Sequence, residues 1–287
     1  MIEGLEERLQ RAFATGDESE LDVLGYGEIS TVLAHEHEGV RYACKRLPDF
    51  DSRERFDRYA EVFERYVQSL REAGVEAVPS TLVALDRKNA VAGWCIQRVL
   101  PAEGMLIRRM REASLAEAEA LFERLCEGVL AAVDARRGLD AQISNWAIVG
   151  DRLLYLDLTT PLLRDASGKE ELDTGLFLAS LPWALRGPVY LFLLKSILDK
   201  YHDPRGVVLD VLGNLHKEKL AHLIEPLRAL ANRRLERPLS AKEIRAYYED
   251  DASTWALLQR LRRADRWWQR TIRGRPYPFL LPGRIER

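Results

Sequence analysis

The chain has 287 residues and a formal net charge of −2; 47% of its residues are hydrophobic and 31% are charged. This composition is typical of a globular protein, and the length is sufficient for two lobes with a core each. A net charge so close to zero does not favour a polyanionic partner. The composition therefore argues against functions that depend on a strongly charged chain, and nucleic acid is a disfavoured partner.

Neither a secretory signal nor a membrane span is expected. The first eight residues are acidic and amphipathic, unlike a signal peptide. The most apolar stretch, residues 176–198, is interrupted by Pro182, Arg186, Pro188 and Lys195, which predicts two buried helices and no span. We therefore expect a cytoplasmic protein with no membrane partner.

The first predicted elements are two strands joined by a glycine-rich turn, residues 24–32, followed by a second hairpin at 36–39. Gly25 and Gly27 lack Cβ atoms, so their backbone N–H groups can approach a polyphosphate closely. Ser30 stands where a third glycine would complete the motif. Taken alone, the turn is better explained as an ordinary β-hairpin.

An apolar strand, residues 42–45, ends in Lys45, a cation suited to holding phosphates. The next segment, residues 53–72, has apolar residues on one helical face and predicts a helix. Glu64 borders that face, whereas Glu61 lies nearly opposite it. We expect Glu64 to pair with Lys45 and keep Glu61 as the alternative; the remaining alternative is that both glutamates are solvated.

The most informative segment runs from Asp140 to Asp157. It contains Asp140-x-x-x-x-Asn145, a hairpin turned at Gly150, and an apolar strand closed by Asp157. An aspartate at the start of such a loop can orient an acceptor hydroxyl, and Asn145 and Asp157 offer oxygen ligands for Mg²⁺ bound to phosphates. Asp and Asn are also common turn residues, so the signal lies in the ordered set.

With these motifs in this order, the chain resembles the protein-kinase-like superfamily, particularly its small-molecule branch of aminoglycoside and choline phosphotransferases. The motifs that carry the resemblance span residues 20–165. The resemblance implies an α+β, two-lobed fold, with a β-rich N-lobe over residues 1–97 and a helical C-lobe over residues 98–287. ATP would lie between the lobes.

The resemblance also implies a role for each motif residue. Lys45 would bind the α- and β-phosphates and Glu64 would orient it, Asp140 would be the catalytic aspartate, and Asn145 and Asp157 would bind Mg²⁺. Residues 98–101, after a buried strand at 90–97, would form the hinge that binds adenine. The expected ATP contacts are Gly25, Gly27, Ser30, Lys45, Gln97 and Val99.

Three features depart from the family pattern. Ser30 replaces the third glycine, the stretch Arg137-Gly138-Leu139-Asp140 has no histidine before its aspartate, and Asp157-Leu158-Thr159 replaces Asp-Phe-Gly. The missing histidine removes a structural support of this loop more than a chemical group. The segment after Asp157 is short and lacks Ala-Pro-Glu, which favours a small-molecule acceptor over a protein.

Two functions follow from the motifs and their departures. The first is an ATP- and Mg²⁺-dependent phosphotransferase acting on the hydroxyl of a small metabolite or antibiotic-like compound. The alternative is a catalytically silent kinase-fold protein that binds nucleotide or a partner. The sequence leaves open the acceptor, the choice between ATP and GTP, and the oligomeric state.

The C-terminal part offers two further candidates. Asp210, Asn214 and His216 are candidates to line an acceptor pocket. The alternative for Asp210 and Asn214 is that they cap a helix. The last 33 residues carry nine arginines interleaved with aromatic residues, and we expect this tail to dock on the body of the protein. Binding of a phosphorylated acceptor or of nucleic acid is the alternative for the tail.

Metal and redox chemistry outside the expected magnesium site is not favoured. Cys44, Cys95 and Cys126 are widely spaced within apolar segments, so we expect buried, reduced thiols. His35 and His37 lie at an expected hairpin end, where a solvated turn is favoured over a metal site.

Overall fold

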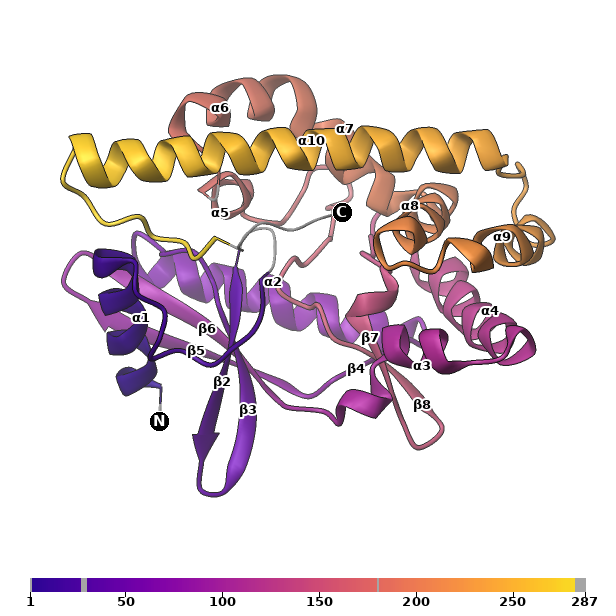
Figure 1. The fold of residues 1–287 in the computed structure, drawn as a ribbon, viewed down its shortest axis with the longest axis horizontal. Coiled ribbons are helices and arrows are strands. Elements are labelled where there is room, and N and C mark those ends of the chain that lie inside the picture. The colour runs from indigo at the N-terminus through magenta and orange to yellow at the C-terminus, as the bar shows by residue number, and fades with distance from the viewer. Residues whose placement is uncertain (1, 27–29, 180, 282–287) are drawn as a thin grey trace.

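The computed structural model describes residues 2–26, 30–179 and 181–281. The fold is α+β, as predicted: an antiparallel sheet occupies the N-terminal part and helices make up most of the C-terminal part (Figure 1). The strands are β1 (Val23–Tyr26), β2 (Thr31–His37), β3 (Val40–Arg46), β4 (Glu76–Ala77), β5 (Ser80–Arg87), β6 (Ala90–Arg98), β7 (Trp146–Val149) and β8 (Arg152–Tyr155).

Helices cover the sheet and make up most of the chain as far as Ile272. The α-helices are α1 (Glu3–Thr15), α2 (Arg53–Glu72), α3 (Leu106–Glu112), α4 (Leu115–Ala132), α5 (Thr174–Ala179), α6 (Trp183–Pro188), α7 (Leu194–Asp199), α8 (Pro204–Lys217), α9 (Ile224–Asn232) and α10 (Ala241–Trp267). The shorter helical turns are η1 (Ala102–Gly104), η2 (Ile143–Asn145), η3 (Val189–Leu193), η4 (Lys200–His202), η5 (Ala221–Leu223) and η6 (Trp268–Ile272).

The N-terminal sheet has the strand order β1-β2-β3-β6-β5, with every neighbouring pair antiparallel. The predicted hairpin between β2 and β3 turns at Glu38 and Gly39, whose φ angles are 51° and 73°. Positive φ at both central residues matches the twist of a two-residue hairpin. The tight turn fixes the register of β3 and therefore the side of the sheet on which each of its side chains lies.

Helix α2 forms over the predicted residues 53–72. Ser52 caps its N-terminus, because the Ser52 side chain accepts a hydrogen bond from the Arg55 amide. Its buried face carries large aromatic residues at helical spacing. They are Phe56, Tyr59, Phe63 and Tyr66, followed by Leu70.

Strands from the two parts of the chain also pair directly. The β7–β8 hairpin turns at Gly150, where φ is 60°, and β4 pairs in parallel with β8. A capping box formed by Ser114 and Glu117 opens α4. The segment that follows α2 is thus attached to the hairpin that leads to Asp157.

The hydrophobic cores do not divide at the predicted lobe boundary. One cluster joins the aromatic face of α2 to the C-terminal helices, and a smaller one joins α1 to the opposite face of the sheet. Leu280, near the C-terminus, belongs to the smaller cluster. The larger core therefore spans both parts of the chain, because α2 turns its apolar face toward the C-terminal helices.

Residues 176–198 also differ from expectation. They form α5, α6, η3 and α7 instead of two buried helices, and Trp183 and Leu191 are 63% and 70% exposed. Pro182 lies at the start of α6 and Pro188 at its end, so the segment cannot continue as one long helix. Within the described chain, no helix is both long enough and apolar enough to cross a membrane.

The tail docks on the protein, as expected. Helix α10 runs from the neighbourhood of α8 and α9 across to the side of the molecule that carries α1 (Figure 1). Beyond it, Arg270 donates hydrogen bonds to the Ala12 and Phe13 carbonyls at the end of α1, and Tyr277 and Leu281 are buried.

A substitution at Gly93 in β6 tests the packing of α2 against the sheet. A Cβ atom there would lie 2.6 Å from Phe50 and 3.2 Å from Phe56. We expect Gly93→Ala to lower the free energy of unfolding by about 1–3 kcal/mol, as overpacking does. Denaturant titration measures the loss. Gly4→Ala is the control, because a Cβ at Gly4 meets no atom within 4 Å and alanine favours the helix; an equal effect at both positions would contradict the close packing.

Candidate active site

Lys45 and Asp157 meet across 112 residues of sequence. The Lys45 Nζ atom donates a hydrogen bond of 2.7 Å to Asp157 Oδ1, and the two side chains are 17% and 27% exposed. Lys45 lies on the face of β3 opposite Cys44, which packs against α1. The register of β3 therefore directs the lysine toward the end of the β7–β8 hairpin.

The charge of Asp157 is stabilised in this position. Burial opposes ionisation of the carboxyl group, but the Lys45 ammonium and the hydrogen bond that Thr159 Oγ1 donates at 3.1 Å outweigh it and hold the pKa of Asp157 below its ordinary value. Asp157 is thus an ionised acceptor at the centre of the site.

Glu64 does not orient Lys45 in this structure, contrary to the prediction. Glu64 and Glu61 are both exposed on α2, and Lys45 pairs with Asp157. The buried face of α2 runs through Tyr59 and Phe63, and Glu64 follows Phe63 by one residue, about 100° around the helix. Aromatic residues therefore occupy the side of α2 where the glutamate was expected.

The loop that contains Asp140 is held by its own polar groups. Asn145 Nδ2 donates to the Asp140 carbonyl at 3.2 Å, and Trp146 Nε1 donates to the Ala141 carbonyl at 3.2 Å. The Gln142 amide donates to Asp140 Oδ1 at 3.4 Å. The spacing of Asp140 and Asn145 thus forms a closed loop in which the asparagine amide faces back toward the aspartate.

Two buried tyrosines lie close to both carboxylates. Burial raises the pKa of Tyr66 well above its ordinary value, and the charges of Asp157 and Asp140 raise it further. The same causes raise the pKa of Tyr155. The Leu156 amide also donates to the Asn145 carbonyl at 2.8 Å. Hydrogen bonds thus link Asn145 both to Asp140 and to Leu156, the residue before Asp157.

The space beside Gly138, just before the loop of Asp140, is filled from another part of the chain. A Cβ atom at Gly138 would lie 3.0 Å from the Tyr201 carbonyl and 3.2 Å from the His202 ring, which is buried. The Tyr201 carbonyl also accepts a 3.0 Å hydrogen bond from the Leu139 amide. His202 therefore supports the loop from η4, where the chain lacks a histidine of its own next to Asp140.

The glycine-rich turn is described in part. Gly25 lies in β1 with open space beside its Cα atom, Gly27 falls outside the described residues, and Ser30 is buried. Near the end of β6, Gln97 Nε2 donates to Ser80 Oγ and to the Leu156 carbonyl, and the Val99 amide donates to the Arg41 carbonyl. The Val99 N–H group is therefore already engaged in a backbone hydrogen bond.

Asn145 and Asp157 fit a magnesium ion that is also bound by phosphates. No group of three or more His, Cys, Asp or Glu residues in the described chain could hold a metal by itself. Mg²⁺ commonly takes one or two protein oxygens and completes its shell with water and phosphate oxygens. The amide oxygen of Asn145 and the carboxylate of Asp157 supply ligands of that kind.

Asp210 and Asn214 do not cap a helix, and both side chains are buried. Asp203 caps α8, and Asp210 lies buried in its middle, where it accepts hydrogen bonds from Lys200 at 3.0 Å and from the Tyr247 hydroxyl. Asn214 donates to the Asp210 carbonyl at 2.9 Å. The network joins α8 to α10. His216 instead stacks on Tyr248, with ring centroids 4.8 Å apart.

The sequence did not identify Tyr59, Thr159 or His202 as parts of the site. The helical phase of α2 placed Tyr59 on its apolar face, but nothing local indicated that its hydroxyl would donate to the Thr159 carbonyl at 3.0 Å.

The cysteines are buried thiols, as expected: Cys44, Cys95 and Cys126.

Residues 4–266 match one family model, described as "Family of unknown function (DUF6206)". The chain belongs to this family. No curated protein matches it. Among solved structures, the chain is similar to a mutant of the Mycobacterium tuberculosis PknI kinase domain, with 17% identity, a TM-score of 0.30, and coverage of 80% of this chain and 93% of that one. So low a TM-score supports no conclusion about the site, which depends on the geometry described above.

Acid titration of stability tests the Lys45–Asp157 pair. Because the pKa of Asp157 is depressed in the folded state, its contribution to stability is complete above the unfolded pKa of about 3.9 and is lost as pH falls through the folded value. We expect Asp157→Asn to make the loss of unfolding free energy below about pH 4 shallower than in the wild type. The control is Asp151→Asn, in the exposed β7–β8 turn. Parallel acid curves for the wild type and Asp157→Asn would contradict the pairing.

Proposed function

We propose that this chain is an ATP- and Mg²⁺-dependent phosphotransferase that acts on the hydroxyl group of a small molecule. The observation that carries the proposal is the contact of Lys45 with Asp157, together with the hydrogen bonds that tie Asn145 to the Asp140 carbonyl and to Leu156, the residue before Asp157. These are the groups that positioning and charge neutralisation in phosphoryl transfer require.

Each residue has a distinct role in this proposal. Lys45 binds the α- and β-phosphates of ATP, and Asp140 accepts or orients the acceptor hydroxyl. Asn145 and Asp157 hold Mg²⁺, which supplies positive charge on the phosphates when it is bound. The Lys45–Asp157 ion pair keeps both groups ordered before the nucleotide arrives, which reduces the entropic cost of assembling the site.

A small acceptor is supported by the segment that follows Asp157. Leu163 forms a bridge with Arg137, and Arg164 pairs with Glu170 at 2.5 Å and with Asp199 at 2.6 Å. A chain held so closely to the body leaves little extended surface for a polypeptide substrate. A small hydroxylated compound needs no such surface.

A second candidate is a catalytically silent kinase-fold protein that binds nucleotide or a partner. It is favoured by the direct contact between Lys45 and Asp157 together with the exposed position of Glu64. In this alternative, the ion pair is structural and persists when nucleotide is added.

Substitution of Asp140 separates the two candidates. We expect Asp140→Asn to lower kcat by about a hundred-fold or more, because general acid–base groups contribute that much. The thermal stabilisation by Mg²⁺-ATP should remain, whereas Asp157→Asn should lose it. ADP release with a panel of small hydroxylated acceptors, together with thermal unfolding, gives both readouts.

Asp151→Asn is again the control and should behave as the wild type. Full transfer by Asp140→Asn, or loss of both activity and nucleotide binding in that variant, would contradict the role of Asp140. Stabilisation by Mg²⁺-ATP without ADP release in the wild type would favour the silent protein.

The exposed position of Glu64 generates its own prediction. We expect Glu64→Gln to change kcat and the Mg²⁺-ATP stabilisation by less than about two-fold, as surface substitutions do. Glu61→Gln is the matched control on the same helix. A ten-fold loss confined to Glu64→Gln would mean that α2 rotates in the nucleotide complex and brings Glu64 to Lys45 after all.

A further inference from the structure

The last turn of α8 meets the loop that carries Asp140. The Lys217 Nζ atom donates a hydrogen bond of 3.1 Å to Gln142 Oε1, across 75 residues of sequence. The Gln142 amide in turn donates to Asp140 Oδ1 at 3.4 Å. One glutamine residue therefore separates the Lys217 ammonium from the carboxylate that is proposed to receive the acceptor hydroxyl.

Lys217 differs from the other lysines that are withdrawn from solvent. Among the described lysines, three are not exposed: Lys45, Lys200 and Lys217. The first two donate to a carboxylate, Asp157 at 2.7 Å and Asp210 at 3.0 Å. Lys217 donates to a neutral amide, although its side chain is only 28% exposed. A part-buried ammonium gives up hydration, and an ion pair at hydrogen-bonding distance is the usual compensation.

The carboxylate nearest to Lys217 in the described chain is shared with a second cation. Glu218 Oε1 lies 3.8 Å from Lys217 Nζ, which is too far for a hydrogen bond. Arg111, at the end of α3, approaches Glu218 Oε2 more closely, at 3.3 Å. Glu218 therefore serves Arg111 first, and the ion-pairing capacity of Lys217 is incompletely used.

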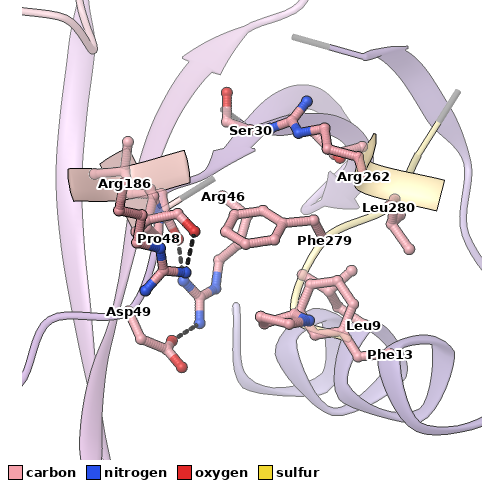
Figure 2. Close-up of a pocket in the computed structure, with 14 residues that line it drawn as sticks. Leu9, Phe13, Ser30, Arg46, Pro48, Asp49, Arg186, Arg262, Phe279 and Leu280 are labelled. Atoms are coloured by element: carbon pink, nitrogen blue, oxygen red, sulfur yellow. Dashed lines mark hydrogen bonds and ion pairs between the residues drawn. The ribbon is translucent and has the colours of Figure 1, made fainter. Parts of the chain in front are cut away.

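Arg46 gives a comparison within the same protein (Figure 2). This buried cation donates to both oxygens of Glu6, at 2.8 and 3.0 Å, and to Asp49, the contact drawn in Figure 2. It lines a cavity beside α1 and the tail whose walls include neither Asp140 nor Lys217. Arg46 thus has the carboxylate partners that Lys217 lacks at hydrogen-bonding distance.

The helix end explains the charge of Lys217 but not its direction. A basic residue in the last turn of a helix interacts favourably with the negative end of the helix dipole, and both His216 and Lys217 lie in the last turn of α8. The hydrogen bond of Lys217 nevertheless leads to a side chain of another segment. Its direction therefore places the ammonium at the loop of Asp140.

We propose that Lys217 binds an anionic group of the acceptor, so that the substrate is a small hydroxylated compound that also carries a phosphate or a carboxylate. This inference rests on the proposed phosphotransferase function. Asp140 and the triphosphate of ATP would repel such an acceptor, and an ammonium beside the loop offsets that repulsion. Lysine is a compact point charge and suits either oxyanion.

The position of Lys217 favours the acceptor over the nucleotide. Lys45, the cation proposed for the phosphates of ATP, belongs to β3 and meets Asp157. Lys217 belongs to α8 in the helical part of the chain and meets Gln142, which bonds to Asp140. The two lysines thus approach the site from different parts of the chain, one at each proposed substrate.

Calorimetric titration with glycerol phosphate, glycerate and glycerol tests the proposal without requiring turnover. The probes share a hydroxylated carbon chain and differ in the anionic group. With Mg²⁺-ADP present and the ionic strength constant, at least one anion should bind more tightly than glycerol. A preference for glycerol phosphate alone identifies a phosphate-bearing acceptor, and a preference for glycerate alone identifies a carboxylate. No binding of either anion, or affinity no higher than that of glycerol, would overturn the proposal.

Variants locate the binding of the anion. Lys217→Gln should weaken it about ten- to a hundred-fold, the value of a hydrogen bond to a charged group, and Lys217→Arg should retain most of it. The control is Lys219→Gln, which removes the same charge from an exposed position. Gln142→Glu gives Lys217 a carboxylate partner and should weaken binding as well, which provides the comparison if Lys217→Gln folds poorly. Equal weakening by Lys217→Gln and Lys219→Gln would overturn the proposal.

ADP release separates this inference from the proposed function. Lys217→Gln should lower kcat/KM for the anionic acceptor relative to that for glycerol by the same ten- to hundred-fold, about as much as binding, and mainly through KM. Transfer to neutral acceptors alone would keep the phosphotransferase and overturn the role of Lys217. Anion binding through Lys217 without any ADP release would support the anion site and contradict the phosphotransferase. Loss of the stabilisation by Mg²⁺-ATP in Lys217→Gln would place the ammonium on the nucleotide and overturn the proposal.

Discussion

The attachment of α2 to the C-terminal part of the chain is the constraint on which the rest of the site depends. Two buried hydroxyl groups fix it: Tyr59 donates to the Thr159 carbonyl and Tyr66 donates to the Gly138 carbonyl, each at 3.0 Å. Arg55 adds an ion pair with Asp173. Since the same helix packs under the sheet that carries Lys45, its aromatic face sets the separation between the lysine and the loop of Asp140.

Local motifs were predictable because short stretches of sequence determine them. The turn at Gly39, the helix over 53–72 and the hairpin at Gly150 each follow from periodicity and turn residues. The partner of Lys45 was not predictable in this way. Glu64 borders the apolar face on a helical wheel, but a shift of one residue from Phe63 is enough to point it to solvent, and only packing decides which residue faces inward.

The sequence did not reveal which distant residues fill positions where the chain departs from the protein-kinase motif pattern. The sequence showed that no histidine precedes Asp140, but not that His202, more than 60 residues later, would fill the space that Gly138 leaves open. Likewise, Asp210 fits a helix cap or a pocket by residue type, and its burial between Lys200 and Tyr247 depends on how α8 meets α10. Such pairings depend on tertiary contacts that carry no local signature.

Helix α10 has a consequence for motion. It has 27 residues, so it is about 40 Å long, and it meets α8 near its start, while Arg270 just beyond it bonds to the end of α1. Besides α2 and the backbone after β6, this helix is therefore a further connection between the N-terminal sheet and the helical part. A rotation of the sheet relative to the helical part would strain it. Such a rotation requires α10 to bend or its far end to release α1, so the movement is coupled to release of the tail.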